Sequence, residues 1–268
     1  MKKFGRQLRA RFLQGFSVAV ITYLMVPLAL IIILSFNKPR GRQNTSWNQF
    51  SIDAWTNICR DPTICRAFSL SVQIAILVTI VATILGTLIS FALVRHKFRG
   101  KDSATLGVFI PLSTPDVIVG ASLLALFLNI FIPLGFWTIL IAQITFTISF
   151  VVVVVNARLT GMDQRLEQAA MDLYATPFQT FRYVTFPLAL PGIAAAALIS
   201  LSLSFDDYII TSFNSGRLVT FPLYVWNAAQ RGIPPQVNVI ASIMFLGSLG
   251  LVALAAIIAK RRKLKTLV

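Results

Sequence analysis

Six long apolar runs constrain this chain more than any other feature. They lie at approximately 15–36, 70–94, 106–128, 131–156, 187–211 and 238–259 of the 268 residues. A helix needs about 20 apolar residues to cross roughly 30 Å of hydrocarbon, and each run has about that length. Only 12% of the residues are charged, against roughly 25% in soluble domains, which is too few for a water-facing shell. The sequence therefore predicts an all-α transmembrane protein of about six helices, forming a single domain over 1–268.

Two of the runs carry finer signals. The third contains Pro111, Pro115 and Asp116, and we expect it to be broken or kinked. The first run is preceded by basic residues, as the apolar core of a signal peptide is. It is, however, longer than such a core. We therefore expect the first run to be a retained span.

The basic residues predict the orientation of the chain. The net charge is +15, but the Lys and Arg residues lie in clusters between the apolar runs, which argues against nucleic acid as a partner. Seventeen of the 24 fall on one side, namely before the first run, within 95–101, within 157–186 and after the last run. The positive-inside rule makes this side cytoplasmic. We expect a multi-pass protein of a bacterial cytoplasmic (inner) membrane with both termini inside.

The longest predicted cytoplasmic loop, about 157–186, contains two short helix signals. Residues 165–173 are rich in Ala, Leu, Glu and Met, which favour helix. Thr176 before Pro177 suits a helix N-cap followed by proline at the first helical position. We call residues 165–180 the docking segment. Taken alone, these residues also fit an ordinary helix lying against the membrane surface.

A spaced pattern in this loop resembles the signature of ABC-importer permeases. Gln168-Ala169-Ala170, Tyr174 and the run 184–187 match the family pattern Glu-Ala-Ala, three residues, Gly, nine residues, Ile, one residue, Leu-Pro. Gln168 replaces the usual Glu, although Glu167 adjoins it. Tyr174 replaces the usual Gly, and Tyr adopts a positive φ poorly, whereas a helix-compatible angle would suit it.

The resemblance implies a MetI-like fold in which this loop is a coupling helix that inserts into an ATPase subunit. The residues it assigns to coupling are Glu167, Gln168, Ala169, Ala170, Asp172, Tyr174 and Pro177. The chain contains no Gly-x4-Gly-Lys-Ser/Thr sequence, so we predict that it is not an enzyme and that partner subunits hydrolyse ATP.

Further stretches, spread over nearly the whole chain, resemble the permeases of spermidine/putrescine importers. They include 98–101, 113–118, 135–137, 144–146, 158–163, 203–208, 212–213 and 235–238. The resemblance implies polyamine as cargo, no cofactor, and four partner subunits besides lipid. These four are a second homologous permease, two cytoplasmic ATPase subunits and an extracytoplasmic substrate-binding protein. Iron, sulfate, thiamine or a sugar remain alternative cargoes within the family.

The acidic residues near the apolar runs indicate a cationic cargo independently of the family resemblance. Of nine acidic residues, Asp116, Asp206 and Asp207 lie within or beside apolar runs, where a charge is costly without a partner or a water-filled path. A flexible polycation would need a few spaced carboxylates along apolar walls. The alternative is that these residues pair with Arg, bond backbone amides or cap broken helices. By resemblance Trp55 is a further candidate contact, the alternative being an interfacial anchor.

The remaining signals are weaker. Cys59 and Cys65 lie in a predicted external loop, where a disulfide is possible, and with no His nearby they do not suggest a metal site. His96, the only histidine, sits in a basic loop without a catalytic partner. Two other classes of function remain open, a stand-alone secondary transporter, which predicts an inverted repeat, and a membrane scaffold without cargo.

Overall fold

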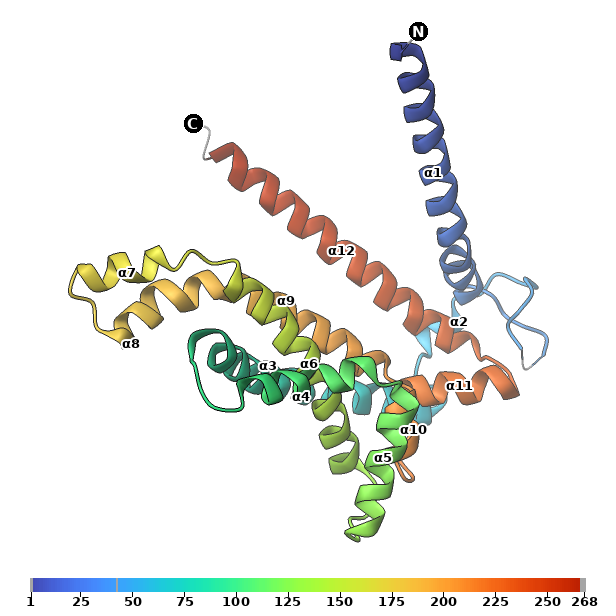
Figure 1. Cartoon of the computed structure of the whole chain (residues 1–268). Helices are drawn as coiled ribbons and strands as arrows, with labels where there is room; N and C mark the ends of the chain where they lie inside the picture. Colours follow the sequence, from blue (N-terminus) through green and yellow to red (C-terminus); the bar gives the residue numbers. More distant parts are fainter. Residues whose placement is uncertain (1, 42, 266–268) are drawn as a thin grey trace. The chain divides into compact units, whose positions relative to one another are not determined.

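The computed structural model describes residues 2–41 and 43–265, and within them every regular element is a helix. A single isolated bridge, between Asn37 and Phe50, is the extended pairing in these residues. The chain forms two compact units, one of residues 1–65 and 225–268, the other of residues 66–224. Figure 1 labels the helices along the chain.

The first unit contains two long helices and the loop that follows the first. Its helices are α1 (Lys2–Ser35), α2 (Asp53–Thr56) and α12 (Pro235–Lys265), and α12 packs against both α1 and α2. The loop after α1 is organised by Asn37, whose amide donates to Asn44 Oδ1 (2.6 Å) and to the Ser46 carbonyl (2.8 Å). The Asn37 Oδ1 in turn accepts from the Asn48 backbone amide (2.7 Å). A buried asparagine therefore fixes the loop from within.

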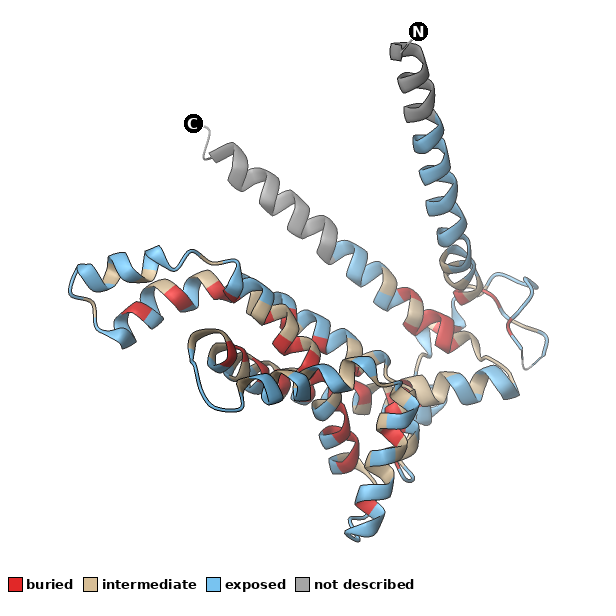
Figure 2. Ribbon diagram, in the orientation of Figure 1, coloured by how far each residue is buried: buried red, intermediate tan, exposed pale blue. Residues whose placement is uncertain are grey.

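The second unit is built around two helices that pack along each other, α6 (Phe136–Thr160) and α9 (Phe186–Asp206). Buried Val151 and Val155 of α6 meet Ala189 and Ala196 of α9 in one apolar cluster. Figure 2 shows the buried residues of α6 and α9 and the largely exposed α7. The other helices are α4 (Lys101–Ser113), α5 (Asp116–Asn129), α7 (Arg165–Asp172), α8 (Pro177–Thr180), the π-helical turn η1 (Phe181–Thr185) and α10 (Ile209–Asn214). Helices α3 (Pro62–Arg95) and α11 (Phe221–Arg231) cross from one unit to the other.

The all-helical membrane fold is confirmed. Among the described residues, four helical stretches are long and apolar enough to span a membrane: 12–35, 62–95, 136–160 and 177–206. The pair α4 and α5 makes a fifth if it is counted as one bent span, and residues 235–250 form a shorter apolar helix. The break predicted in the third run is also present, because α4 and α5 meet at Thr114–Pro115 with a bend of 109°.

Three predicted span boundaries were wrong. The fifth span begins at Pro177, ten residues before the predicted start, because α8 and the turn η1 continue into α9 without a break. The fifth run does not continue as helix to 211, because α9 ends at Asp206 and a separate helix, α10, begins at Ile209. Apolar Ile209 and Ile210 conceal this break in the sequence. The second span begins at Pro62, eight residues before the predicted start, since the Asp61 carboxylate accepts the Thr63 amide (2.9 Å) and proline takes the first helical position.

Candidate functional site

Three aspartates were predicted to lie on a transport path, and the structure gives them different surroundings. Asp207 lies in the elbow between α9 and α10, just past the last residue of α9. Its Oδ2 accepts the backbone amide (2.8 Å) and the hydroxyl (2.6 Å) of Thr211. The Ile210 amide donates to its Oδ1 at 3.3 Å. Asp207 therefore caps the first turn of α10.

A glutamine from a distant helix completes this network. Gln143 of α6 is buried, and its Nε2 donates to Asp207 Oδ2 (3.2 Å) and to Thr211 Oγ1 (2.8 Å). The Ser204 hydroxyl of α9 donates to Gln143 Oε1. The elbow between α9 and α10, two helices that are labelled in Figure 1, is thus fastened by hydrogen bonds from α6, α9 and α10. Most of the acceptor capacity of Asp207 is occupied.

Asp206 and Asp116 are placed differently. Asp206, the last residue of α9, is exposed, and Asp116, in the first turn of α5, is half-buried. Neither carboxylate is part of the two ion pairs found in the described residues. The path role of Asp116, Asp206 and Asp207 stays a prediction.

Close backbone contact ties Asp116's helix to the elbow. A Cβ at Gly120 of α5 would lie 3.2 Å from the Ile210 Cα and 2.9 Å from the Phe213 ring. The side-chain amide of Asn214 in α10 donates to the Gly120 carbonyl at 3.3 Å. Glycine is required here because any side chain would push α5 and α10 apart. The start of α5 and the elbow after α9 therefore form one packed region.

The docking segment forms two short helices, as predicted. Helix α7 covers Arg165–Asp172, and α8 covers Pro177–Thr180. The hydroxyl of Thr176 accepts the Gln179 amide (3.3 Å), and the Gln179 side chain accepts the Thr176 amide (2.8 Å), which makes a capping box. Pro177 occupies the first helical position. The predicted cap is confirmed.

The turn between α7 and α8 keeps the backbone angle that glycine would favour. Tyr174 has a φ of 63°, and its side chain is 96% exposed. A helix-compatible angle at this position would have suited tyrosine, and the structure does not adopt one. A non-glycine residue in the left-handed region costs roughly 1 kcal/mol or more. The turn geometry is thus retained despite the change of residue.

The acidic residue of α7 points back into its own unit. Glu167 Oε1 accepts from Arg95 Nη2 at 2.6 Å and from the Thr185 hydroxyl at 2.8 Å. The side chains of Arg95 and Glu167 are only 17% and 18% exposed. The other predicted coupling residues are exposed, except half-buried Ala170: Gln168, Ala169, Asp172, Tyr174 and Pro177. Glu167 therefore differs from its neighbours because its side chain is bonded within its own unit.

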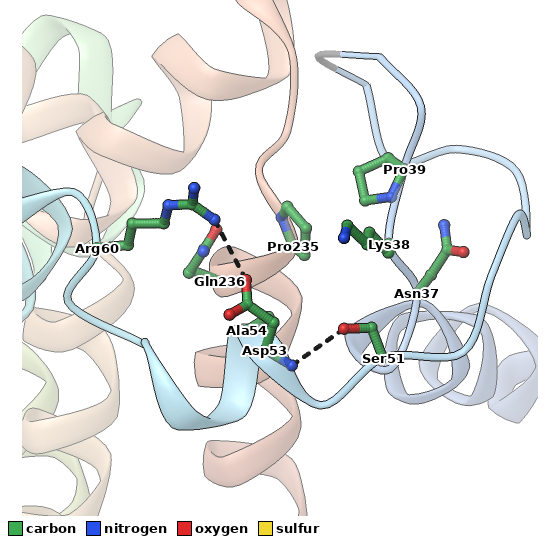
Figure 3. A pocket seen from close by; sticks show the side chains of 9 residues that line it. All are labelled: Asn37, Lys38, Pro39, Ser51, Asp53, Ala54, Arg60, Pro235 and Gln236. Atoms are coloured by element: carbon green, nitrogen blue, oxygen red, sulfur yellow. Dashed lines mark hydrogen bonds and ion pairs between the residues drawn. The ribbon is translucent and has the colours of Figure 1, made fainter.

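Trp55 lies in the first unit, in α2, and its indole is held by its own unit. The indole N–H donates to Ser35 Oγ at 3.2 Å, and the ring stacks on Phe36 with centroids 5.1 Å apart. The residues that line a nearby cavity of about 310 Å³ include Lys38, Asp53 and Arg60 (Figure 3). Asp53 and Arg60 form an ion pair of 3.2 Å there. The contact role predicted for Trp55 stays a prediction.

The two cysteines are joined. Cys59 and Cys65 form a disulfide that ties the loop after α2 to the first turn of α3. Within the part of the chain that the structure describes, no cluster of three His, Cys, Asp or Glu side chains could hold a metal ion.

Sequence reasoning missed several of the residues that build these sites. Gln143 carried a usable signal, since a polar amide within an apolar span usually has a partner inside the protein. Arg95 entered only the charge count, and Thr185 only the signature run. Gln143 bonds to Asp207, 64 residues away, and Arg95 bonds to Glu167, 72 residues away. Local sequence patterns cannot indicate partners at such separations.

Comparisons with known proteins agree with the fold and extend it. A family described as "Binding-protein-dependent transport system inner membrane component" matches residues 82–264. The spermidine/putrescine transport system permease protein PotC of Haemophilus influenzae is 38% identical over 92% of this chain and 96% of its own length. The putrescine transport system permease protein PotI of Escherichia coli (strain K12) is 36% identical over 88% of this chain and 85% of its own.

Solved structures show the same fold at lower identity. A chain of a bacterial ABC transporter that imports the acidic polysaccharide alginate has a TM-score of 0.62 and 16% identity, covering 94% of this chain and 97% of that one. A chain of the MetNI methionine ABC transporter has a TM-score of 0.57 and 16% identity, covering 79% and 98%.

Proposed function

Because this chain belongs to the family of binding-protein-dependent transport system inner membrane components, we propose that it forms half of a polyamine import path. A second homologous permease forms the other half, two ATPase subunits dock on the cytoplasmic side, and an extracytoplasmic binding protein delivers the cargo. Both termini lie in the cytoplasm, as the distribution of basic residues favours. The chain itself hydrolyses no ATP.

The observation that carries the choice of cargo is the similarity to two polyamine permeases over most of the chain. The acids support it. Exposed Asp206 and half-buried Asp116 lack an ion-pair partner among the described residues, and they belong to helices joined at one packed region. Unpaired carboxylates beside apolar helices suit a cargo with separated ammonium groups and apolar spacers. The same groups would repel sulfate.

The docking segment supports ATPase coupling. Its outward surface is exposed and includes Leu173 (82%) and Tyr174 (96%) at the turn. Surface apolar residues gathered on a rigid, capped turn are typical of a protein contact. In the cycle we propose, closure of the ATPase dimer on ATP moves this segment, the path opens outward to receive cargo, and hydrolysis returns it to the inward state.

The test is ATPase stimulation in the reconstituted complex. The chain is co-expressed with its transporter partners and reconstituted in nanodiscs, and the binding protein is added with putrescine, spermidine, iron or a sugar in turn. We expect stimulation by a polyamine, and loss of that stimulation when Ala169 and Ala170 are both changed to Glu. Stimulation by a different ligand would contradict the cargo but keep the importer. A chain that assembles with no ATPase would contradict the importer itself.

The role of the acids is tested separately. We expect Asp206→Asn and Asp116→Asn each to lower polyamine uptake about tenfold, because each removes a countercharge worth about 1.4 kcal/mol on the path. The amount of assembled complex, measured by quantitative immunoblot, should stay the same. Loss of the complex with normal uptake per remaining complex would assign these residues to structure.

A further inference from the structure

Helix α7 is not held to its unit by an apolar core. None of its eight residues is buried, and only Glu167 and Ala170 are half-buried. Beside it lies a cavity of about 380 Å³, whose lining includes apolar Phe91, Met171 and Phe181 and also Arg95, Glu167 and Thr185. Helix α7 packs against α8 and the turn η1, but without a buried residue it has few apolar contacts through which to pass on a displacement.

One carboxylate oxygen makes the connection instead. Glu167 Oε1 accepts from Arg95, the last residue of α3, and from Thr185, the last residue of the π-helical turn that leads directly into α9. Helices α3 and α7 and the turn η1 thus meet at a single oxygen atom. Arg95 lies 72 residues from Glu167 in the sequence, and Thr185 lies 18 residues from it. We call Arg95, Glu167 and Thr185 the clamp.

The surroundings make the clamp stiff. Both charged side chains are less than one-fifth exposed, and Thr185 is buried. A short, charge-assisted bond in a poorly solvated place is stronger than its surface equivalent. The Nε of Arg95 is buried without a hydrogen-bond partner in the described residues, so this guanidinium depends on Glu167 for its compensation.

We propose that the clamp is the side-chain link by which movement of α7 reaches α3 and α9, in addition to the continuous helical stretch 177–206 that joins α8 to α9. This inference rests on the proposed function, since it assumes that the docking segment is moved by an ATPase. Helix α9 then carries the displacement over its 21 residues, roughly 30 Å, to its far end at Asp206. The three clamp residues are positioning residues, which touch neither cargo nor nucleotide.

The experiment compares cargo transported per ATP hydrolysed, at equal amounts of assembled complex in liposomes. The main variant is Arg95→Met with Glu167→Met, since replacing both members of a poorly solvated pair by apolar residues preserves packing. We expect its transport per ATP to fall at least fivefold. Thr185→Val should lower the ratio about threefold, and Arg95→Lys, which keeps the charge, should retain most of it. Asp102→Asn, which neutralises an exposed carboxylate in the first turn of α4, is the control and should match the wild type.

Wild-type transport per ATP in the double methionine variant would overturn the proposal. If that variant fails to assemble, Thr185→Val decides, because it leaves the ion pair in place, and a wild-type ratio there also overturns the clamp. A wild-type complex whose ATPase responds to no loaded binding protein would instead contradict the proposed function, and the clamp with it. The two failures are therefore distinguishable.

Discussion

The described residues contain two ion pairs, and they show how differently the same chemistry behaves in two regions. In the first unit, Arg60 and Asp53 lie 3.2 Å apart on the loop around α2, with side chains 71% and 51% exposed. In the second unit, Arg95 and Glu167 lie 2.6 Å apart with side chains 17% and 18% exposed. The first pair joins residues seven apart, and the second joins residues 72 apart.

The two pairs differ in how much each contributes to the stability of the fold. A pair in water is screened by salt and contributes little to stability. A pair that is mostly out of water is costly to break, because removing one member leaves the other charge uncompensated. The Arg60–Asp53 pair therefore adds little to the loop around α2, whereas the Arg95–Glu167 pair holds separate helices together.

The largest effect that would sharpen this comparison is expected for Glu167→Ala. It leaves Arg95 poorly solvated and unpaired, so we expect a loss of about 2–3 kcal/mol, somewhat below the cost for a fully buried pair. Asp53→Ala, the matched change in the exposed pair, should cost less than about 1 kcal/mol. Thermal unfolding of the complex in nanodiscs measures both. Equal losses would mean that solvent exposure does not separate the two pairs.

A smaller effect is expected for Asp207→Asn, which tests whether a carboxylate can be structural without any ion-pair partner. The amide keeps one acceptor but loses the charge that the Thr211 amide, the Thr211 hydroxyl and Gln143 all point toward. We expect a loss of about 1–2 kcal/mol, typical of a helix cap. Unfolding midpoints in the same nanodiscs would show it. An unchanged midpoint combined with reduced uptake would place Asp207 on the path instead.

Tyr174→Gly should act in the opposite direction. Glycine adopts a φ of 63° without strain, so we expect the α7–α8 turn to gain about 1 kcal/mol. Hydrogen exchange of the amides of residues 173–176 should slow accordingly. If the exposed tyrosine ring is a contact for the ATPase, stimulation will fall even though the turn is steadier, and Tyr174→Phe will keep it. Faster exchange in the glycine variant would contradict the strain.

The smallest effect is expected for Arg60→Gln, at a few tenths of a kcal/mol at low salt. In 1 M salt, where the Debye length is about 3 Å, the difference from wild type should vanish. Unfolding in both salt conditions checks this. A loss that persists in high salt would show that Arg60 contributes through packing.

Much of this arrangement could be predicted from local sequence. The apolar runs give most of the spans, Pro111 and Pro115 give the broken third span, and Thr176 with Pro177 gives the start of α8. Each of these signals concerns residues close together in the chain. Proline geometry and helix capping act over a few residues, so a single sequence contains what is needed.

The rest depends on distant partners. Nothing local distinguishes Asp206 from Asp207, and only the arrival of Gln143 from another helix completes the network around the second. Glu167 could equally have faced outward like Gln168, and its direction is set by Arg95 and Thr185. The end of α9 was concealed because Ile209 and Ile210 continue the apolar run past the elbow.

The 109° break between α4 and α5 has a consequence for how cells handle the chain before assembly. At Thr114–Pro115 the last carbonyls of α4 and the first amides of α5 lack the continuous helix that would satisfy them. Lipid cannot solvate such groups, so non-helical backbone at membrane depth has to be covered by protein or water. In the importer that we propose, the second permease would cover this backbone, so we expect a newly inserted chain without it to display a defect that membrane quality control can detect. Its lifetime as an orphan should be short, and the abundance of this subunit should follow that of its partner.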